Sequence, residues 1–296
     1  MELPDVLVCG AGGTLGEAWM RGLLHGLEDG ASLDFRACGH FVGTSAGSIV
    51  AAVLAGGHRP QAGDDAARRW GEAAPGDAGG GGAAARGGGA GPPGGFDLAG
   101  ALATPLVVLG RVPGSGLLRA AALSVGPRPS RRMDRVGGLI DGLGASFADG
   151  RLRIAAVDRG SGRRVVFGGP DAPAASVRDA VLASCAVPWI FAPVTIGGRE
   201  YVDGGVWSPT NLDAAPARRG ANILVLAPLL GGPWAAVRAA TSAALRAERL
   251  RLRARVEIVG PDEASNRAMG PNLMDSGPRA DVLAAGYAQG RAMARP

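Results

Sequence analysis

The sequence predicts an α/β protein of three layers, in which helices cover both faces of a mainly parallel sheet. Short apolar runs without strict alternation recur along the chain, which is typical of strands buried on both faces. Helical apolar patterns lie between these runs, and such an alternation of strands with helices indicates a layered α/β domain. The chain has 296 residues, of which 47% are hydrophobic, so it is long enough to enclose a large core.

The apolar runs and helical patterns place the individual elements. Strands are expected at residues 5–9, 40–44, 151–158, 163–167, 201–202, 222–227 and 256–259. Helices are expected at residues 16–28, 46–55, 176–185, 234–255 and 279–291. In the first helix, Trp19, Leu23 and Leu27 recur every four residues and form one apolar face.

The composition is unusual and limits the weight of short motifs. All 31 basic residues are arginine, against 26 acidic residues, which gives a net charge of +5. The 51 glycines and 21 prolines follow no collagen-like period and are interleaved with apolar runs, so neither collagen nor wholesale disorder is expected. An excess of Gly, Ala, Pro and Arg is typical of a GC-rich genome. Glycine motifs therefore arise easily by chance here and need support from their context.

One stretch differs in composition from the rest of the chain. Residues 74–95 contain only Ala, Gly and Pro apart from Asp77 and Arg86, so they cannot bury apolar surface and are expected to form a disordered loop. We interpret residues 57–150 as an insertion, otherwise helical, in a single domain of residues 1–296 whose core is formed by 1–56 and 151–296. The insertion is either a lid or a long loop.

The chain carries no recognisable targeting or metal-binding pattern. Residues 1–5 are acidic and lack a basic region and a cleavage site, so no signal peptide is expected. No run of about 18 uninterrupted apolar residues occurs, so no membrane span is expected. The cysteines, Cys9, Cys38 and Cys185, are odd in number and contain no C-x-x-C pair, which argues against a disulfide framework and a metal site. We expect a cytoplasmic protein without a metal.

A nucleophile motif lies between an expected strand and an expected helix. Gly43, Ser45 and Gly47 form the pattern G-x-S-x-G. In a sharp strand-to-helix turn this pattern projects the serine hydroxyl, and the glycines let strand and helix pass closely. The helix N-terminus also favours developing negative charge. The simpler alternative is that Ser45 is only the N-cap of a buried helix.

A histidine base for this serine is not evident. The hydrolase order Ser, Asp, His needs a late histidine, but His25, His40 and His58 all lie within the first 58 residues. His40 precedes the strand that ends at Ser45, which puts it about 15 Å away at the opposite strand end. We therefore expect no triad, and the best-placed remaining base is the carboxylate of Asp203.

Asp203 ends a short expected strand and is followed by Gly204 and Gly205. An aspartate before two glycines is common in tight turns, so a purely structural role is one interpretation. The other is that Asp203 accepts the serine proton, which requires partial burial and a hydrogen bond between the two side chains.

A glycine-rich loop at residues 10–16 follows the first expected strand and opens the first helix. A dinucleotide fingerprint counted from Gly10 would need glycine at position 15, where Leu15 stands. Two interpretations remain, namely a tight turn or an anion nest whose amide groups hold an oxyanion. The first strand and the strand before Ser45 are expected to be parallel neighbours, so both turns would emerge at the same carboxyl edge of the sheet.

Three glycine-bearing motifs follow one another in a specific order. The segment Ala183-Ser184-Cys185-Ala186-Val187-Pro188-Trp189-Ile190-Phe191-Ala192-Pro193 leads into the last of them. The motifs are Gly12-Gly13-x-x-Gly16, Gly43-x-Ser45-x-Gly47 and Asp203-Gly204-Gly205. In this order the sequence resembles the patatin-like phospholipase family. The resemblance covers residues 5–56 and about 151–230, whereas residues 57–150 match nothing.

The resemblance implies a hydrolase that cleaves fatty-acyl esters of lipids, as a phospholipase A or lysophospholipase does, through a Ser–Asp dyad and without a cofactor. Ser45 would attack the ester, Asp203 would take and return the proton, and the amides of Gly12 and Gly13 would stabilise the oxyanion. Where the family usually has Arg or Lys, this chain has Leu15, which leaves the loop less electropositive. That departure keeps open a second interpretation, a lipid-binding or regulatory relative with weak or no catalysis.

The helix expected at 234–255 has an apolar stripe beside a row of arginines. The stripe consists of Trp234, Val237, Thr241, Leu245 and Leu252, and the row of Arg238, Arg246, Arg249 and Arg253. Either the helix meets anionic headgroups at a membrane surface, or it is docked on the protein with a solvated basic face. No nucleic-acid-binding motif accompanies the charge. The expected partners are thus a lipid or acyl-ester substrate and a peripheral membrane surface, not a nucleic acid.

Overall fold

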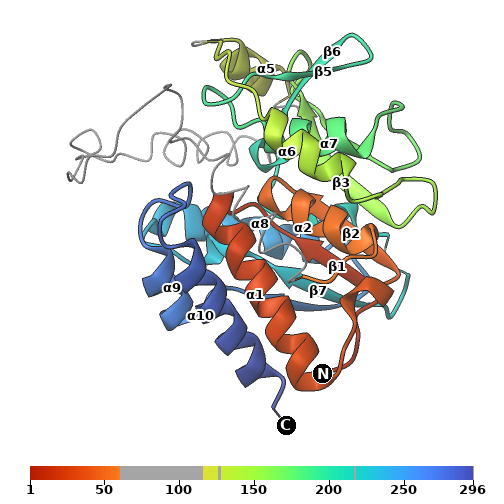
Figure 1. Cartoon of the computed structure of the whole chain (residues 1–296). Helices are drawn as coiled ribbons and strands as arrows, with labels where there is room; N and C mark the ends of the chain where they lie inside the picture. Colours follow the sequence, from red (N-terminus) through yellow and green to blue (C-terminus); the bar gives the residue numbers. More distant parts are fainter. Residues whose placement is uncertain (61–115, 126–127, 217, 296) are drawn as a thin grey trace, which may run out of the picture.

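A computed structural model describes residues 1–60, 116–125, 128–216 and 218–295 (Figure 1). Across these ranges eight strands form one sheet in the order β5-β6-β3-β2-β1-β7-β8, and β4 pairs with β3. The strands are β1 (Val6–Cys9), β2 (His40–Thr44), β3 (Leu152–Asp158), β4 (Arg164–Phe167), β5 (Val194–Ile196), β6 (Arg199–Asp203), β7 (Asn222–Leu226) and β8 (Arg255–Val259). The run from β3 through β2, β1 and β7 to β8 is parallel, whereas β4, β5 and β6 pair antiparallel.

Helices and short 3-10 turns connect the strands. The helices are α1 (Gly13–Ala31), α2 (Ala46–Ala55), α5 (Gly116–Ser124), α6 (Asp134–Asp141), α7 (Val177–Cys185), α8 (Ala235–Arg249), α9 (Glu263–Met269) and α10 (Arg279–Met293). The 3-10 turns are η1 (Phe35–Ala37), η2 (Gly204–Val206), η3 (Leu212–Ala214) and η4 (Pro228–Leu230). In the described ranges, none of these helices is both long enough and apolar enough to cross a bilayer.

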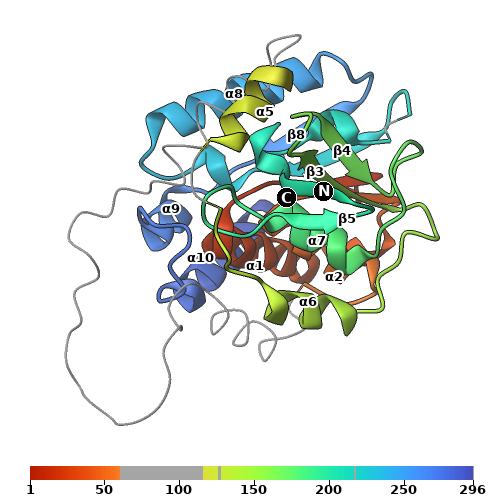
Figure 2. The ribbon, with the colours of Figure 1, turned by 90° about the horizontal axis from the view of Figure 1, so that it is seen from above.

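The two faces of the sheet bury different sets of side chains. Leu7 of β1 belongs to the core that also contains apolar residues of α1, α2, α7 and α10. Val8 points the other way and packs in a second core with Leu245 of α8. Figure 2 shows the result, with α8 on one side of the sheet and α1, α2, α7 and α10 on the other. The predicted three-layer α/β architecture with a mainly parallel sheet is therefore confirmed.

Helices α1 and α10 lie side by side (Figure 1) and approach closely through glycines. A Cβ atom on Gly26 of α1 would lie 2.2 Å from the carbonyl oxygen of Tyr287, and one on Gly290 of α10 would lie 2.2 Å from that of Leu23. Gly22 and Gly286 are equally confined by backbone of the other helix. The two helices thus pack backbone against backbone, and α1 is held along its length.

Most predicted elements are confirmed, with three differences. Strand β5 was not predicted, because its three residues are too few to show a pattern. The helix predicted at 234–255 is too long, since α8 ends at Arg249 and the chain needs a connection before β8 begins at Arg255. Helix α9 was not predicted either, because its seven residues are too few and too polar to show an apolar repeat.

The predicted insertion at 57–150 is only partly described. Within this range the structure describes the helices α5 and α6, whereas the loop predicted at 74–95 lies outside the described residues. The boundaries of the insertion and its interpretation as a lid or a loop stay predictions.

Candidate active site

Ser45 lies in the sharp strand-to-helix turn that its motif predicts, between β2 and α2. Its backbone has φ 52° and ψ −126°, a conformation that costs a non-glycine residue of the order of 1–3 kcal/mol. The flanking glycines make the turn sterically feasible. A Cβ on Gly43 would lie 2.4 Å from the Cα of Ser48, and one on Gly47 would lie 2.0 Å from the carbonyl oxygen of Cys9.

The backbone of Ser45 is fixed by two other serines. Its N–H donates to Ser184 Oγ (2.8 Å), which in turn donates to the carbonyl oxygen of Ala155 in β3 (2.7 Å). The Ser45 carbonyl accepts from Ser48 Oγ (2.6 Å). Ser45 occupies the N-cap position of α2, but its side chain makes no capping hydrogen bond to the helix.

The hydroxyl of Ser45 instead reaches Asp203, the last residue of β6. Asp203 is only 5% exposed. Burial raises the pKa of Asp203 to about 7, although the neighbouring Ser45 side chain and the hydrogen bond from the Gly205 N–H oppose that rise. The Gly205 N–H donates to Asp203 Oδ1 at 2.7 Å. Asp203 therefore closes the turn through Gly205 and also lies beside Ser45.

The glycine-rich loop lies against both other motifs. A Cβ on Gly205 would lie 3.7 Å from the Cβ of Ala11, and one on Gly47 would lie 2.8 Å from the carbonyl oxygen of Gly10. The predicted parallel pairing of the first strand with the strand before Ser45 is confirmed, with Cys9 opposite Gly43. The three motifs therefore meet at one edge of the sheet.

Gly12 and Gly13 begin α1, and both positions require glycine. Gly13 has φ 61°, and a Cβ on Gly12 would lie 2.6 Å from Pro228 Cβ. The hydrogen bonds found among the described residues include no acceptor for the N–H of Gly12 or Gly13. Amides without an intramolecular acceptor at a helix N-terminus can bind an oxyanion. Gly16 also packs against Pro228, because a Cβ added at Gly16 would lie 3.0 Å from the Cβ of Pro228.

Leu15 does not face this edge of the sheet. Its side chain is fully buried in the core shared with α10, and its N–H donates to the carbonyl oxygen of Leu273 (3.0 Å). A buried guanidinium, that of Arg279, does lie beside the loop and donates to the carbonyl oxygen of Thr14 (3.2 Å). Arg279 also pairs with Glu17 (2.5 Å), so its charge is largely neutralised there.

Two of the three histidines have side-chain partners elsewhere, and the third begins the strand that leads to Ser45. His25 pairs with Asp29 on α1 (3.4 Å), and His58 bonds to the carbonyl oxygen of Leu143 (3.1 Å). His40 begins β2, at the strand end opposite Ser45, and burial lowers its pKa. In the described ranges, no group of three His, Cys, Asp or Glu side chains is arranged to hold a metal ion.

Asn211 is a site residue that sequence reasoning missed. Its side-chain amide donates to Thr44 Oγ1 (3.1 Å), to the Gly204 carbonyl (3.3 Å) and to the Ser208 carbonyl (2.8 Å). Asn211 is fully buried with φ 49°, a backbone region that asparagine tolerates better than most residues. It thus links the strand before Ser45 to the turn after Asp203. In the sequence Asn211 stands among other polar residues, Ser208, Thr210 and Asp213, and nothing there distinguishes it.

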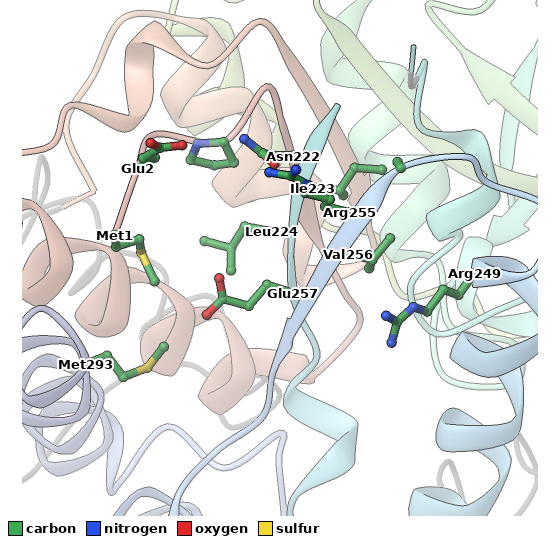
Figure 3. A pocket seen from close by; sticks show the side chains of 12 residues that line it. Met1, Glu2, Asn222, Ile223, Leu224, Arg249, Arg255, Val256, Glu257 and Met293 are labelled. Atoms are coloured by element: carbon green, nitrogen blue, oxygen red, sulfur yellow. The ribbon is translucent and has the colours of Figure 1, made fainter. Parts of the chain in front are cut away.

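A surface cavity of about 690 Å³ lies elsewhere and contains none of the predicted site residues. Figure 3 shows Leu224 of β7 and Glu257 of β8 beside Met293 of α10 in its lining. Asn222 and Arg255, also in the lining, begin β7 and β8. The cavity is therefore at the opposite edge of the sheet from Ser45.

Solved structures of other proteins are similar to this chain. VipD from Legionella pneumophila is similar in structure, with a TM-score of 0.49 and 14% identity over 99% of this chain and 67% of VipD. The type III effector protein ExoU gives a TM-score of 0.38 and 17% identity over 97% of this chain and 53% of ExoU, so the chain spans about half the length of ExoU. No curated protein matches the sequence significantly.

The sequence profile described as patatin-like phospholipase matches residues 7–216. That range is more than two thirds of the chain, and it contains the glycine-rich loop, the turn at Ser45 and the turn at Asp203. The chain belongs to the patatin-like phospholipase family.

Proposed function

We propose that the protein is a serine acyl hydrolase that cleaves fatty-acyl ester bonds of lipids with Ser45 as nucleophile and Asp203 as base. The observation that carries the proposal is that the Ser45 side chain, in its strained turn, lies beside the buried Asp203 carboxyl and acts on its pKa. Family membership implies hydrolysis of lipid esters. Phospholipase A or lysophospholipase activity is the specific form that we propose.

The reaction proceeds through an acyl-enzyme. Asp203 accepts the hydroxyl proton while Ser45 Oγ bonds to the ester carbonyl carbon, and the carbonyl oxygen becomes an oxyanion. The ester C–O bond then breaks, and Asp203 returns the proton to the leaving alcohol. A water molecule attacks the acyl-enzyme with Asp203 again as base, which releases the fatty acid and restores Ser45.

The surroundings of Asp203 suit it to this role. A free aspartate has a pKa of about 4 and is a weak base at neutral pH. Burial raises the pKa of Asp203 to about 7, which lies near the pH at which a general base works best. No histidine is then needed to activate Ser45.

The amides of Gly12 and Gly13 form the oxyanion hole in this proposal. They lie at the N-terminus of α1, next to Asp203 and Ser45 through the Ala11–Gly205 and Gly10–Gly47 contacts. Preorganised donors of this kind typically contribute about 10²–10³ in rate each. The neutral side chain of Leu15 is buried in the core, so stabilisation of the oxyanion rests on the backbone.

Labelling with a fluorophosphonate probe tests the nucleophile. The wild-type protein and Ser146→Ala, a matched change at an exposed serine, should be labelled, whereas Ser45→Ala should not. Equal labelling of Ser45→Ala would overturn the proposal.

A panel of acyl esters of increasing chain length then measures turnover by wild type, Ser45→Ala and Asp203→Asn. Lipid binding without turnover of any ester by the wild type would instead favour the lipid-binding relative with weak or no catalysis.

A further inference from the structure

We propose that α5 and the arginines that follow it form a surface that docks the protein on an anionic lipid bilayer. This inference rests on the proposed function, because it identifies how the site reaches a lipid substrate. The α5 surface, as we call it, consists of Leu117, Leu118, Val125, Arg128, Arg131 and Arg132.

Helix α5 exposes large apolar side chains on one face and buries the other. Leu117 is 81% exposed, Leu118 62% and Val125, directly after the helix, 72%. Leu123 and Arg119 on the opposite face are buried. Clustered apolar side chains left in water mark a surface that meets another apolar phase. The helix is thus fixed on the protein by one face and offers the other outward.

The buried face of α5 is seated on the segment that carries Asp203. Leu123 packs in one cluster with Val202 and Val206, which flank Asp203–Gly205 on either side. The Arg119 guanidinium stacks over the Trp207 ring at 4.6 Å. A bilayer that receives the leucines of α5 would therefore lie over the segment that carries Asp203, with α5 between them.

The loop beyond α5 adds another fixed contact to the same region. Trp189 Nε1 donates to the carbonyl oxygen of Val125 (3.0 Å), and the Ala192 N–H donates to that of Arg131 (2.8 Å). Trp189 and Ala192 belong to the connection between α7 and β5. The basic end of the α5 surface is therefore held to the body of the protein.

The charge of the α5 surface selects for anionic lipids. No acidic residue occurs between residues 116 and 133, and residues 128–135 hold four arginines and one aspartate. Arg128, Arg131 and Arg132 are exposed. Among the residues that the structure describes, no carboxylate lies within salt-bridge distance of these three guanidinium groups. Exposed leucines next to unneutralised arginines are the combination that binds headgroups and acyl chains together.

The α8 helix is a weaker candidate for the same role. Its arginines Arg246 and Arg249 are exposed, but Thr241 and Leu245 of its apolar stripe are buried against the sheet. The docked interpretation of this helix is thereby confirmed. Leu250, at the C-terminal end of α8, is 87% exposed. It lies near the starts of the parallel strands, away from Ser45 at their ends, and serves as a matched control.

Sedimentation with vesicles tests the proposal, with every protein carrying Ser45→Ala so that binding is measured without turnover. The vesicles contain phosphatidylcholine and phosphatidylglycerol in equal parts, or phosphatidylcholine alone. The double change Leu117→Asp, Leu118→Asp should weaken binding to the mixed vesicles by about tenfold or more, because two anchors are lost and two negative charges added. Leu250→Asp should bind as its parent does.

A second variant separates charge from apolar anchoring. Arg128→Gln, Arg131→Gln and Arg132→Gln together should weaken binding to the mixed vesicles about tenfold or more, while binding to pure phosphatidylcholine changes little. Thermal unfolding confirms that each variant is folded. Undiminished binding by the folded Leu117→Asp, Leu118→Asp protein, or equal loss with Leu250→Asp, would overturn the inference. Because every protein in this test carries Ser45→Ala, the result does not depend on whether the dyad catalyses hydrolysis.

Discussion

The side-chain amide of Asn211 donates a hydrogen bond to the hydroxyl of Thr44 at 3.1 Å, and this contact ties the Asp203 turn to the strand that ends at Ser45. The same amide also holds the Gly204 carbonyl. Asn211 bonds to neither Ser45 nor Asp203 directly, so we infer that it is a positioning residue for the proposed nucleophile and base.

Asn211→Ala should therefore lower kcat by about tenfold or more and leave KM nearly unchanged, because a small displacement of paired groups slows the chemical step. Asn211→Gly, which accepts the positive φ, should show the same loss of kcat with a smaller loss of stability. Steady-state kinetics on a soluble ester and thermal unfolding measure the two effects.

Asn266→Ala is the control for this prediction. Asn266 also bridges two segments, through the Gly232 N–H (2.7 Å) and the Pro261 carbonyl (3.0 Å), but it lies in α9. Its replacement should reduce stability without reducing kcat. A folded Asn211→Ala protein with wild-type kcat would show that Asn211 has only a structural role.

The pH dependence of hydrolysis follows from the environment of Asp203. Burial raises the pKa of Asp203 to about 7, and only the ionised carboxylate accepts the proton of Ser45. The value of kcat/KM for a soluble ester should therefore fall about tenfold per pH unit below pH 7 and level off above it. Circular dichroism over the same range verifies the fold. An acid limb with a midpoint near about pH 4, the value for an exposed aspartate, would contradict the assignment.

Asp203→Asn should abolish hydrolysis and make the protein more stable at pH 8. The pKa of Asp203 is raised in the folded state, so the stability that this group contributes is present below the unfolded pKa and is lost as the pH rises through the folded pKa. The wild type accordingly holds a buried charge at pH 8 that asparagine lacks. The gain should reach at most about 4 kcal/mol.

The size of this gain should itself depend on pH. It should shrink as the pH falls from 7 towards 4, because Asp203 becomes protonated in the folded wild type. Denaturant unfolding of both proteins at pH 5 and pH 8 measures it. A gain that is equal at both pH values, or a loss at pH 8, would contradict the raised pKa.

Ser45→Gly should be more stable than Ser45→Ala, although both are inactive. The conformation of Ser45, φ 52° and ψ −126°, is accessible to glycine but strained for alanine. The difference in the free energy of unfolding should be about 1 kcal/mol. Glycine avoids the backbone strain at this position, but it loses more conformational entropy on folding, which offsets part of the gain. Denaturant unfolding of the two variants measures it, and Ser146→Ala against Ser146→Gly at an exposed site gives the reference. Greater stability of the alanine variant would mean that the turn is relaxed.

The parts of the site that could be predicted are those encoded locally. Gly43, Ser45 and Gly47 are close in sequence and are needed by a single turn, so the strand, turn and helix were predictable together. The position of Asp203 followed from its own turn, from the absence of a late histidine and from the order of the motifs. The sheet was predictable where short apolar runs mark the strands, as in β1, β2 and β3.

The remaining parts depend on contacts between distant segments. The Ser45–Ser184 and Asn211–Thr44 hydrogen bonds join residues 139 and 167 positions apart, and no local pattern encodes them. The raised pKa of Asp203 likewise depends on burial by several elements. The role of α5 was not predictable, because a short helix shows its exposed face only once its other face is docked.

The glycine contact between α1 and α10 has an evolutionary consequence. A side chain added at Gly22, Gly26, Gly286 or Gly290 would meet backbone atoms of the opposite helix, and backbone atoms cannot be trimmed by a second mutation. A larger residue at any of these four positions therefore cannot be accommodated by a smaller side chain on the opposite helix. Two side chains in contact can adapt in that way, because one can become smaller when the other becomes larger. Helix α10 lies outside the range of the family profile, yet it backs the helix that begins at Gly13. In a sequence as rich in glycine as this one, glycines at these positions arise easily. Once the two helices are in contact, the glycines are difficult to replace by larger residues.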